Sequence, residues 1–209
     1  MNDIVIYLIC RGRTINDDLP RPLVLGRGLD SALADKEALK PMACSMGERS
    51  LDAIYTSPAG RALATASLIS QASFASVRIN SALEPVNRGT WEGRPVPEIM
   101  TESADEYAAF QRDPVRCRCG GGESMQAVRD RVVRFLRQCV QQHDGEHIAL
   151  VTHADVIRAA IAGVVGLPLD RARDIDQTPG CINVIRGIGN EFTVGAVNQT
   201  VVPEEVAFC

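Results

Sequence analysis

Three side chains stand where an α/β protein would place its chemistry. Arg11 directly follows an apolar run over residues 4–10. His153 directly follows a second such run over residues 148–152, and Arg61 lies near the start of a predicted helix. Ligands of α/β sheets bind beyond the carboxyl ends of the strands. Guanidinium groups and the free N–H groups at a helix start both attract anions. If the fold brings these three side chains together, their charge would suit a small anion.

The elements that would position these residues alternate along the chain. Short, β-branched apolar runs predict strands, and apolar residues at three- and four-residue spacing predict helices. Strands are predicted over residues 4–9, 51–56, 77–79, 148–152, 182–186 and 192–197, and helices over residues 59–70, 95–112, 123–143 and 156–165. Residues 14–47 show no clear pattern. We therefore expect an α/β fold in a single domain over residues 1–209: a three-layer α/β/α sandwich with a mostly parallel central sheet.

Five short segments resemble, in order, the signature motifs of one enzyme superfamily. They are the strand and loop of residues 4–14, Ser-Pro-x-x-Arg-Ala-x-x-Thr-Ala over 57–66, Gly-x-Trp-Glu-Gly over 89–93, Gly-Gly-Glu-Ser over 121–124, and the strand, histidine and helix of 151–158. This order is similar to that of the histidine phosphatase (phosphoglycerate mutase-like) superfamily, over roughly residues 4–186. The resemblance implies that superfamily's fold and its phosphate pocket.

The resemblance also assigns particular residues to that pocket, which the family builds from two arginines and two histidines. Arg61 matches the second arginine, and His153 matches the second histidine. Arg11, Gly12 and Thr14 lie in the segment that resembles the phosphate loop. We expect all five to bind the anion, with His153 also a candidate catalytic residue. Without the resemblance, Arg61 could be a surface residue of an alanine-rich helix. His153 would then be interpreted as a buried core histidine with no functional role.

The nucleophile position departs from the family pattern Arg-His-Gly-Glu-Thr. Cys10 stands in the arginine position and Arg11 in the position of the nucleophilic histidine. A guanidinium stays protonated and does not act as a nucleophile. Arg11 could instead bind the anion, or fill the site with its own side chain. Cys10 could supply a thiolate, but Asn16 stands where a Cys-based phosphatase loop needs arginine, so a buried thiol is the favoured interpretation.

The proton donor is altered as well. In the family an acidic residue lies six positions before the tryptophan of the Gly-x-Trp-Glu-Gly segment, and counting back from Trp91 gives Pro85. Glu84 is adjacent, but neighbouring side chains of an extended chain point to opposite sides. Glu84 would therefore replace the acid only after a local rearrangement beside Pro85. Loss of a nucleophile alone can cost about 10⁶ in rate, or about 8 kcal/mol.

Composition limits the function further. The 209 residues include 22 basic and 26 acidic ones, for a net charge of −4, which gives no support for a nucleic-acid or membrane partner. No signal peptide or membrane span is expected. An odd count of seven cysteines indicates free thiols and a cytoplasmic location. Cys117 and Cys119 lack partners at zinc-ligand spacing, so we expect no metal and no cofactor.

Three functions are then possible. The first is a superfamily member that lacks conventional phosphatase activity and binds a phosphorylated or anionic small molecule, or a partner protein, through Arg11, Arg61 and His153. The second is an enzyme whose pocket has been turned to different chemistry, with His153, Glu84 or Cys10 acting on an unusual substrate. The third, an active phosphomonoesterase, needs a histidine near the first loop. Sequence leaves the ligand and the oligomeric state open, a homodimer included.

Overall fold

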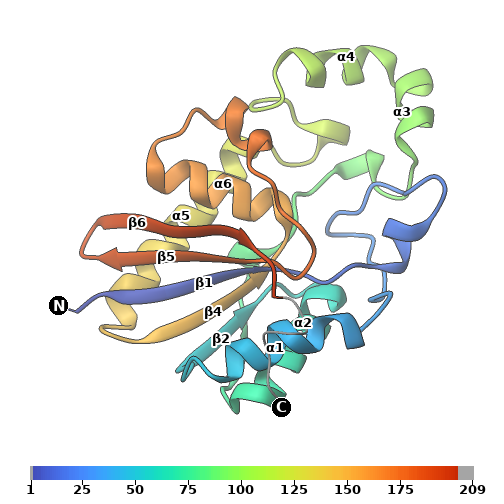
Figure 1. Ribbon diagram of the computed structural model, residues 1–209. Coiled ribbons are helices and arrows are strands. Elements are labelled where there is room, and N and C mark those ends of the chain that lie inside the picture. The colour runs from blue at the N-terminus through green and yellow to red at the C-terminus, as the bar shows by residue number, and fades with distance from the viewer. Residues whose placement is uncertain (1, 202–209) are drawn as a thin grey trace.

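The centre of the protein is a six-stranded sheet, seen in a computed structural model that describes residues 2–201. The strand order is β3-β2-β4-β1-β5-β6 (Figure 1). The pairs β1–β4, β2–β4 and β2–β3 are parallel, whereas β5 is antiparallel to both β1 and β6. The strands are β1 Ile4–Cys10, β2 Ala53–Thr56, β3 Val77–Ile79, β4 His147–Thr152, β5 Ile182–Ile188 and β6 Glu191–Gln199. The mostly parallel α/β sheet expected from the sequence is therefore confirmed.

Helices cover both faces of this sheet (Figure 1). One face packs against α1 (Lys40–Gly47) and α2 (Gly60–Ser73), and the other against α5 (Met125–Gln142) and α6 (Ala154–Val165). Strand β1 supplies both cores because its side chains alternate: Ile4, Ile6, Leu8 and Cys10 face α5 and α6, and Val5, Tyr7 and Ile9 face α1 and α2. Full burial of each large apolar side chain contributes about 1.5–3 kcal/mol.

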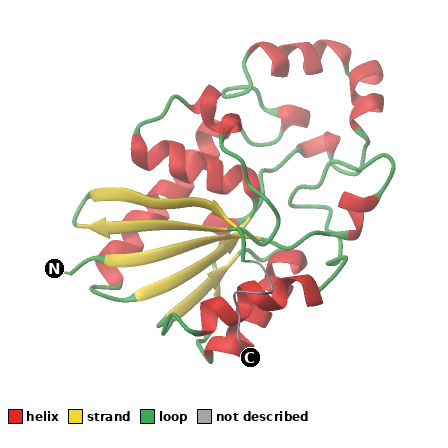
Figure 2. Cartoon of the chain, in the orientation of Figure 1, coloured by secondary structure: helices red, strands yellow, loops and turns green. Residues whose placement is uncertain are grey.

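The parallel strands also fix where the candidate residues meet. Strands β1, β2 and β4 end at the same edge of the sheet, and their arrowheads point toward the same set of loops (Figure 2). Arg11 follows β1, Ser57 follows β2, and His153 follows β4. Residues far apart in the sequence therefore lie together at this edge, as parallel topology requires.

A cap of short helices stands beyond this edge (Figure 1). The single helix expected over residues 95–112 is two helices, α3 (Val96–Glu102) and α4 (Ala104–Arg112), separated by Ser103 in a non-helical conformation. Serine favours helix caps over helix interiors, which explains the break. Trp91, Ile99 and Cys119 form a small separate core there. The 3-10 helices are Ile15–Asp18, Glu37–Leu39, Ser81–Leu83, Gly89–Trp91, Cys119–Gly121 and Leu169–Asp174.

Two smaller expectations were wrong. His143 stands at the polar end of the helix expected over residues 123–143, where the sequence favours a solvated side chain. It is instead 5% exposed, and its Nε2 lies 3.0 Å from the hydroxyl of Tyr55. A polar helix end can bury a histidine where an aromatic hydroxyl offers a partner. The cysteines are not all free thiols either, because Cys44 takes part in a disulfide. Within residues 2–201, no helix is both long and apolar enough to cross a membrane.

Candidate anion-binding site

A cavity of about 200 Å³ lies at the carboxyl edge of the sheet. We call it the inner cavity, and its walls include Arg11, Arg61 and His153. The structure thus brings together the three residues at which the sequence predicts anion recognition. They come from the ends of β1 and β4 and from the first turn of α2.

Arg61 is the most deeply buried cation of the inner cavity. Its side chain is 2% exposed, and its Nη1 lies 2.6 Å from Oδ1 of Asp30. Nη2 donates to the carbonyl oxygen of Gly26 at 3.2 Å. Its Nε is buried and has no hydrogen-bond partner among the described residues. A buried, unpaired guanidinium N–H is costly, so Arg61 holds one donor that no group of the described chain satisfies.

Arg11 lines the cavity without filling it. Its backbone N–H donates to the carbonyl oxygen of Thr152 at 2.8 Å, which ties the loop to β4. Its Nη1 donates to Oδ2 of Asp17 at 2.6 Å and to the carbonyl oxygen of Gly12 at 2.9 Å. Because the guanidinium is held by these partners and the cavity remains open, Arg11 does not act as a plug.

Each of these two arginines is thus paired with a carboxylate of the same chain. Burial alone would raise the pKa values of Asp17 and Asp30, but both are lowered, because the hydrogen bonds and charge of Arg11 and Arg61 outweigh it. Both carboxylates are partly exposed, at 31% for Asp17 and 41% for Asp30. An incoming anion would therefore compete with two internal ones.

His153 is buried, and it is fixed by one hydrogen bond. It is 7% exposed, and its Nε2 lies 3.0 Å from Oγ of Ser57. Burial is the main reason that the pKa of His153 lies well below its usual value, and the nearby charges of Arg61, Arg11 and Arg131 lower it further. The imidazole is therefore neutral at physiological pH, and it can accept a proton or donate one hydrogen bond.

Gly12 and Thr14 lie outside the walls of the inner cavity, although the sequence placed them in the anion site. The N–H of Gly12 donates to Oγ1 of Thr65 at 3.1 Å. The N–H and Oγ1 of Thr14 both donate to Oδ2 of Asp17, at 2.8 and 2.9 Å. Their polar groups are thus used within the protein. Gly12 is small for a packing reason, since a Cβ there would lie 2.4 Å from Cδ1 of Leu39.

Cys10 lies behind the cavity, in the core. It is 2% exposed and is not part of the cavity wall. A hydrogen bond with Cys181, followed by burial, holds the pKa of Cys10 well above its usual value. A protonated, inaccessible thiol does not serve as a nucleophile. The geometry therefore agrees with the interpretation of Cys10 as a buried core residue.

Pro85, at the position where the motif resemblance expects an acid, has no titratable proton. Pro85 lines the inner cavity, so the main chain does bring this position to the site. Glu84 points elsewhere: its Oε2 lies 3.0 Å from Nε of Arg27, beside a second hollow that Glu123 and Arg131 also line. Glu84 is therefore held away from His153, and no rearrangement beside Pro85 brings it into the inner cavity.

Sequence reasoning missed three residues of the inner cavity: Arg88, Asp155 and Arg158. Arg88 donates to Oδ2 of Asp155 at 2.7 Å, and Arg158 donates to Oδ1 at 3.1 Å. Asp155 is the one carboxylate among the described residues that line this cavity, and both of its oxygens are engaged. A signal was available, since Asp155 and Arg158 begin the helix that directly follows His153.

The chemistry this arrangement supports is anion binding. Four arginines line a cavity with one carboxylate, and a neutral histidine stands among them. Guanidinium groups recognise phosphate oxygens through paired, charge-assisted hydrogen bonds. Phosphoryl transfer through the protein would also need a nucleophile and a donor for the leaving group. The motif resemblance assigns these two positions to Arg11 and Pro85, whose side chains supply neither function.

Comparisons with known proteins agree with this fold. Residues 6–200 match the family model described as the histidine phosphatase superfamily, branch 1. The chain is 28% identical over 145 residues to phosphoserine phosphatase 1 of Hydrogenobacter thermophilus, covering 68% of this chain and 69% of that protein. It is 30% identical over 165 residues to a probable phosphoglycerate mutase, GpmB, of Salmonella paratyphi C, covering 78% and 75%.

A solved structure extends the similarity across almost the whole chain. The alpha-ribazole phosphatase from Shigella flexneri is 27% identical and superposes with a TM-score of 0.83, covering 93% of this chain and 96% of that one. The family match spans both candidate arginines, the candidate histidine and the sheet that holds them. The chain therefore belongs to the histidine phosphatase superfamily.

Proposed function

We propose that this protein binds a phosphomonoester or a similar small anion in the inner cavity, without the phosphohistidine turnover of conventional superfamily members. One observation carries the proposal: Arg11 stands in the nucleophile position, yet the cavity behind it stays open and cationic. Binding needs only the charge and geometry of Arg11 and Arg61. Turnover needs a nucleophile that the guanidinium does not provide.

Turnover of p-nitrophenyl phosphate tests the second half of this proposal. We expect the wild-type protein to release no more p-nitrophenol than its His153→Ala variant. Hydrolysis that is clear in the wild type and disappears in His153→Ala would overturn the proposal. Arg21→Met, a substitution at an exposed position, is purified in the same way as a control. Equal activity in wild type, Arg21→Met and His153→Ala would come from a contaminating phosphatase.

Restoring the motif separates the effects of the two altered positions. The double variant Arg11→His with Cys10→Arg returns the family's nucleophile and arginine. A gain of hydrolysis would indicate that the rest of the pocket is competent. Continued inactivity in a folded double variant would attribute the block to Pro85, and the triple variant that adds Pro85→Glu would then be expected to gain activity.

A second candidate function is an enzyme with changed chemistry, and one observation favours it. The imidazole of His153 is neutral and fixed at the edge of an open cavity, which suits a general base. Hydrolysis of p-nitrophenyl sulfate or p-nitrophenyl acetate tests this candidate. Turnover that His153→Gln abolishes, with p-nitrophenyl phosphate inert, would favour changed chemistry over binding alone.

A further inference from the structure

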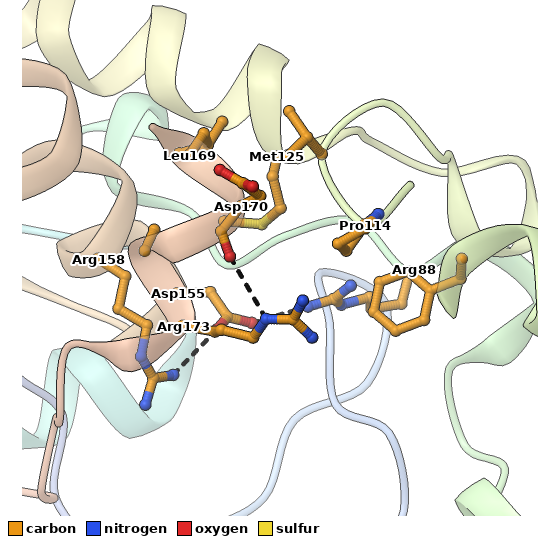
Figure 3. Close-up of a pocket in the computed structure, with 11 residues that line it drawn as sticks. Arg88, Pro114, Met125, Asp155, Arg158, Leu169, Asp170 and Arg173 are labelled. Atoms are coloured by element: carbon orange, nitrogen blue, oxygen red, sulfur yellow. Dashed lines mark hydrogen bonds and ion pairs between the residues drawn. The ribbon is translucent and has the colours of Figure 1, made fainter. Parts of the chain in front are cut away.

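A second cavity, which we call the outer cavity, adjoins the inner one and is lined in part by residues of the cap. Figure 3 shows the side chains that line it. Its volume is about 120 Å³. Arg88, Asp155 and Arg158 line both cavities, so a single ion-paired bridge separates them. A molecule whose anionic group lies between Arg11 and Arg61 would extend past this bridge into the outer cavity.

The walls of the outer cavity differ in chemistry from those of the inner one. Phe110 of α4, Val115, Met125 of α5 and Leu169 supply a largely apolar surface. All four are partly exposed, so their side chains are available to a ligand. The ring of Phe110 packs edge-on against Trp91, with centroids 5.8 Å apart, which fixes this wall in place. Such a surface favours an apolar ligand group over a hydroxylated one.

Guanidinium groups complete the outer cavity. Arg88, Arg158 and Arg173 all line it, and Figure 3 shows the heads of Arg88 and Arg173 near its centre. Asp155 pairs with the first two. Arg173 makes no ion pair within the described part of the chain, and its Nε donates to the carbonyl oxygen of Asp170 at 3.3 Å. Planar guanidinium groups stack on aromatic rings, which an aliphatic polyol does not offer.

We propose that the ligand is the phosphomonoester of an aromatic alcohol, with its phosphate in the inner cavity and its ring in the outer cavity. This inference rests on the proposed function, because it takes the inner cavity as the phosphate site. The ring would contact Val115, Met125 and Leu169 and would stack on a guanidinium of the bridge. Esters of small polar alcohols would gain neither contact.

A calorimetric titration series separates this inference from the proposed function. The wild-type protein is titrated with inorganic phosphate, phenyl phosphate, 1-naphthyl phosphate and glycerol 1-phosphate. We expect the aryl esters to bind at least about tenfold more tightly than phosphate, and glycerol 1-phosphate to bind about as weakly as phosphate. If phosphate binds but the aryl esters gain nothing, the inference fails and the proposed function stands. If none of the four binds, the proposed function fails with it.

Variants locate the gain in the outer cavity. Val115→Trp fills that cavity, so the ratio of aryl-ester to phosphate affinity should fall about tenfold. Val165→Trp, on an exposed part of α6 outside either cavity, should keep the wild-type ratio. Leu169→Gln makes the same wall polar and serves as a second test if Val115→Trp fails to fold. An unchanged ratio in a folded variant of either kind would overturn the proposal.

Discussion

At the scale of single residues, the positive charge of the inner cavity is carried by its arginines and not by His153. His153 is buried and lies near Arg61 and Arg11, and these conditions oppose a positive charge on its ring. The same arginines hold Asp17 and Asp30 in their ionised forms. The cavity therefore keeps its cationic character in its arginines, while the histidine stays neutral. In the proposed complex, the guanidinium groups alone would supply the positive charge that a dianion requires.

The lowered pKa of His153 predicts a pH-dependent stability. Because its folded-state pKa lies below the unfolded value of about 6.5, the unfolded chain takes up the proton first as pH falls. Stability associated with His153 is therefore intact above about pH 6.5 and is lost as pH falls from there toward the folded-state pKa. Urea unfolding should show wild type losing up to about 1.4 kcal/mol per pH unit more than His153→Gln. Parallel pH profiles for the two proteins would contradict the neutral imidazole.

Cys10 should be chemically inert in the folded protein. Its thiol is buried, and its pKa is raised by the hydrogen bond with Cys181. Iodoacetamide at pH 7.5, followed by mass spectrometry, should leave Cys10 unmodified in the native state and should alkylate it in urea. Cys117, which is partly exposed, provides the internal control for reagent activity. Rapid native alkylation of Cys10 would revive the thiolate interpretation.

At the scale of elements, the start of α2 and the loop before α1 form one unit. Asp30 lies in that loop, and its carboxylate pairs with Arg61 in the first turn of α2. A Cβ added at Gly60 would lie 2.9 Å from Oδ2 of Asp30, so the carboxylate also sits against the helix start. The unit thus places an internal anion where a ligand would be expected, at a helix N-terminus beside a buried arginine.

The Asp30→Asn variant tests whether the carboxylate of Asp30 competes with a bound anion for Arg61. Removing the carboxylate leaves buried Arg61 without its ion pair, which should cost about 1–3 kcal/mol, toward the lower end because Asp30 is partly exposed. Inorganic phosphate should restore part of that loss, so its stabilising effect in thermal unfolding should be larger for the variant than for wild type. Asp18→Asn removes an exposed pair with Arg13 and controls for loop charge. Equal phosphate effects in all three proteins would place the anion elsewhere.

Much of the element pattern could be predicted from the sequence, because the strands are short apolar runs and the ordered motifs mark the loops that follow them. Helix α1 could not, because its residues show no decisive periodicity. The break at Ser103 was missed although serine is a typical helix-cap residue. Arg11, Arg61 and His153 were found through motif positions. Arg88 was missed because its role arises only where the loop after β3 meets the start of α6, a contact with Asp155 that no local pattern encodes.

At the scale of the whole molecule, the sheet and the cap contribute to different cavities. The sheet edge supplies the arginines and the histidine of the inner cavity, and the cap supplies Phe110 and its neighbours in the outer one. The superfamily scaffold is therefore intact, and the loss of its nucleophile and acid stays a prediction from the motif positions. That residues 1–209 form one domain stays a prediction, as does the cytoplasmic location.

Titration calorimetry with inorganic phosphate tests the central claim most directly. The wild-type protein should show saturable binding of one phosphate per chain. Arg61→Met should weaken that binding at least about tenfold, because it removes the buried guanidinium, and Arg21→Met, at an exposed site, should leave it unchanged. An absence of phosphate binding by the wild type, or equal affinities in wild type and folded Arg61→Met, would contradict anion recognition in the inner cavity.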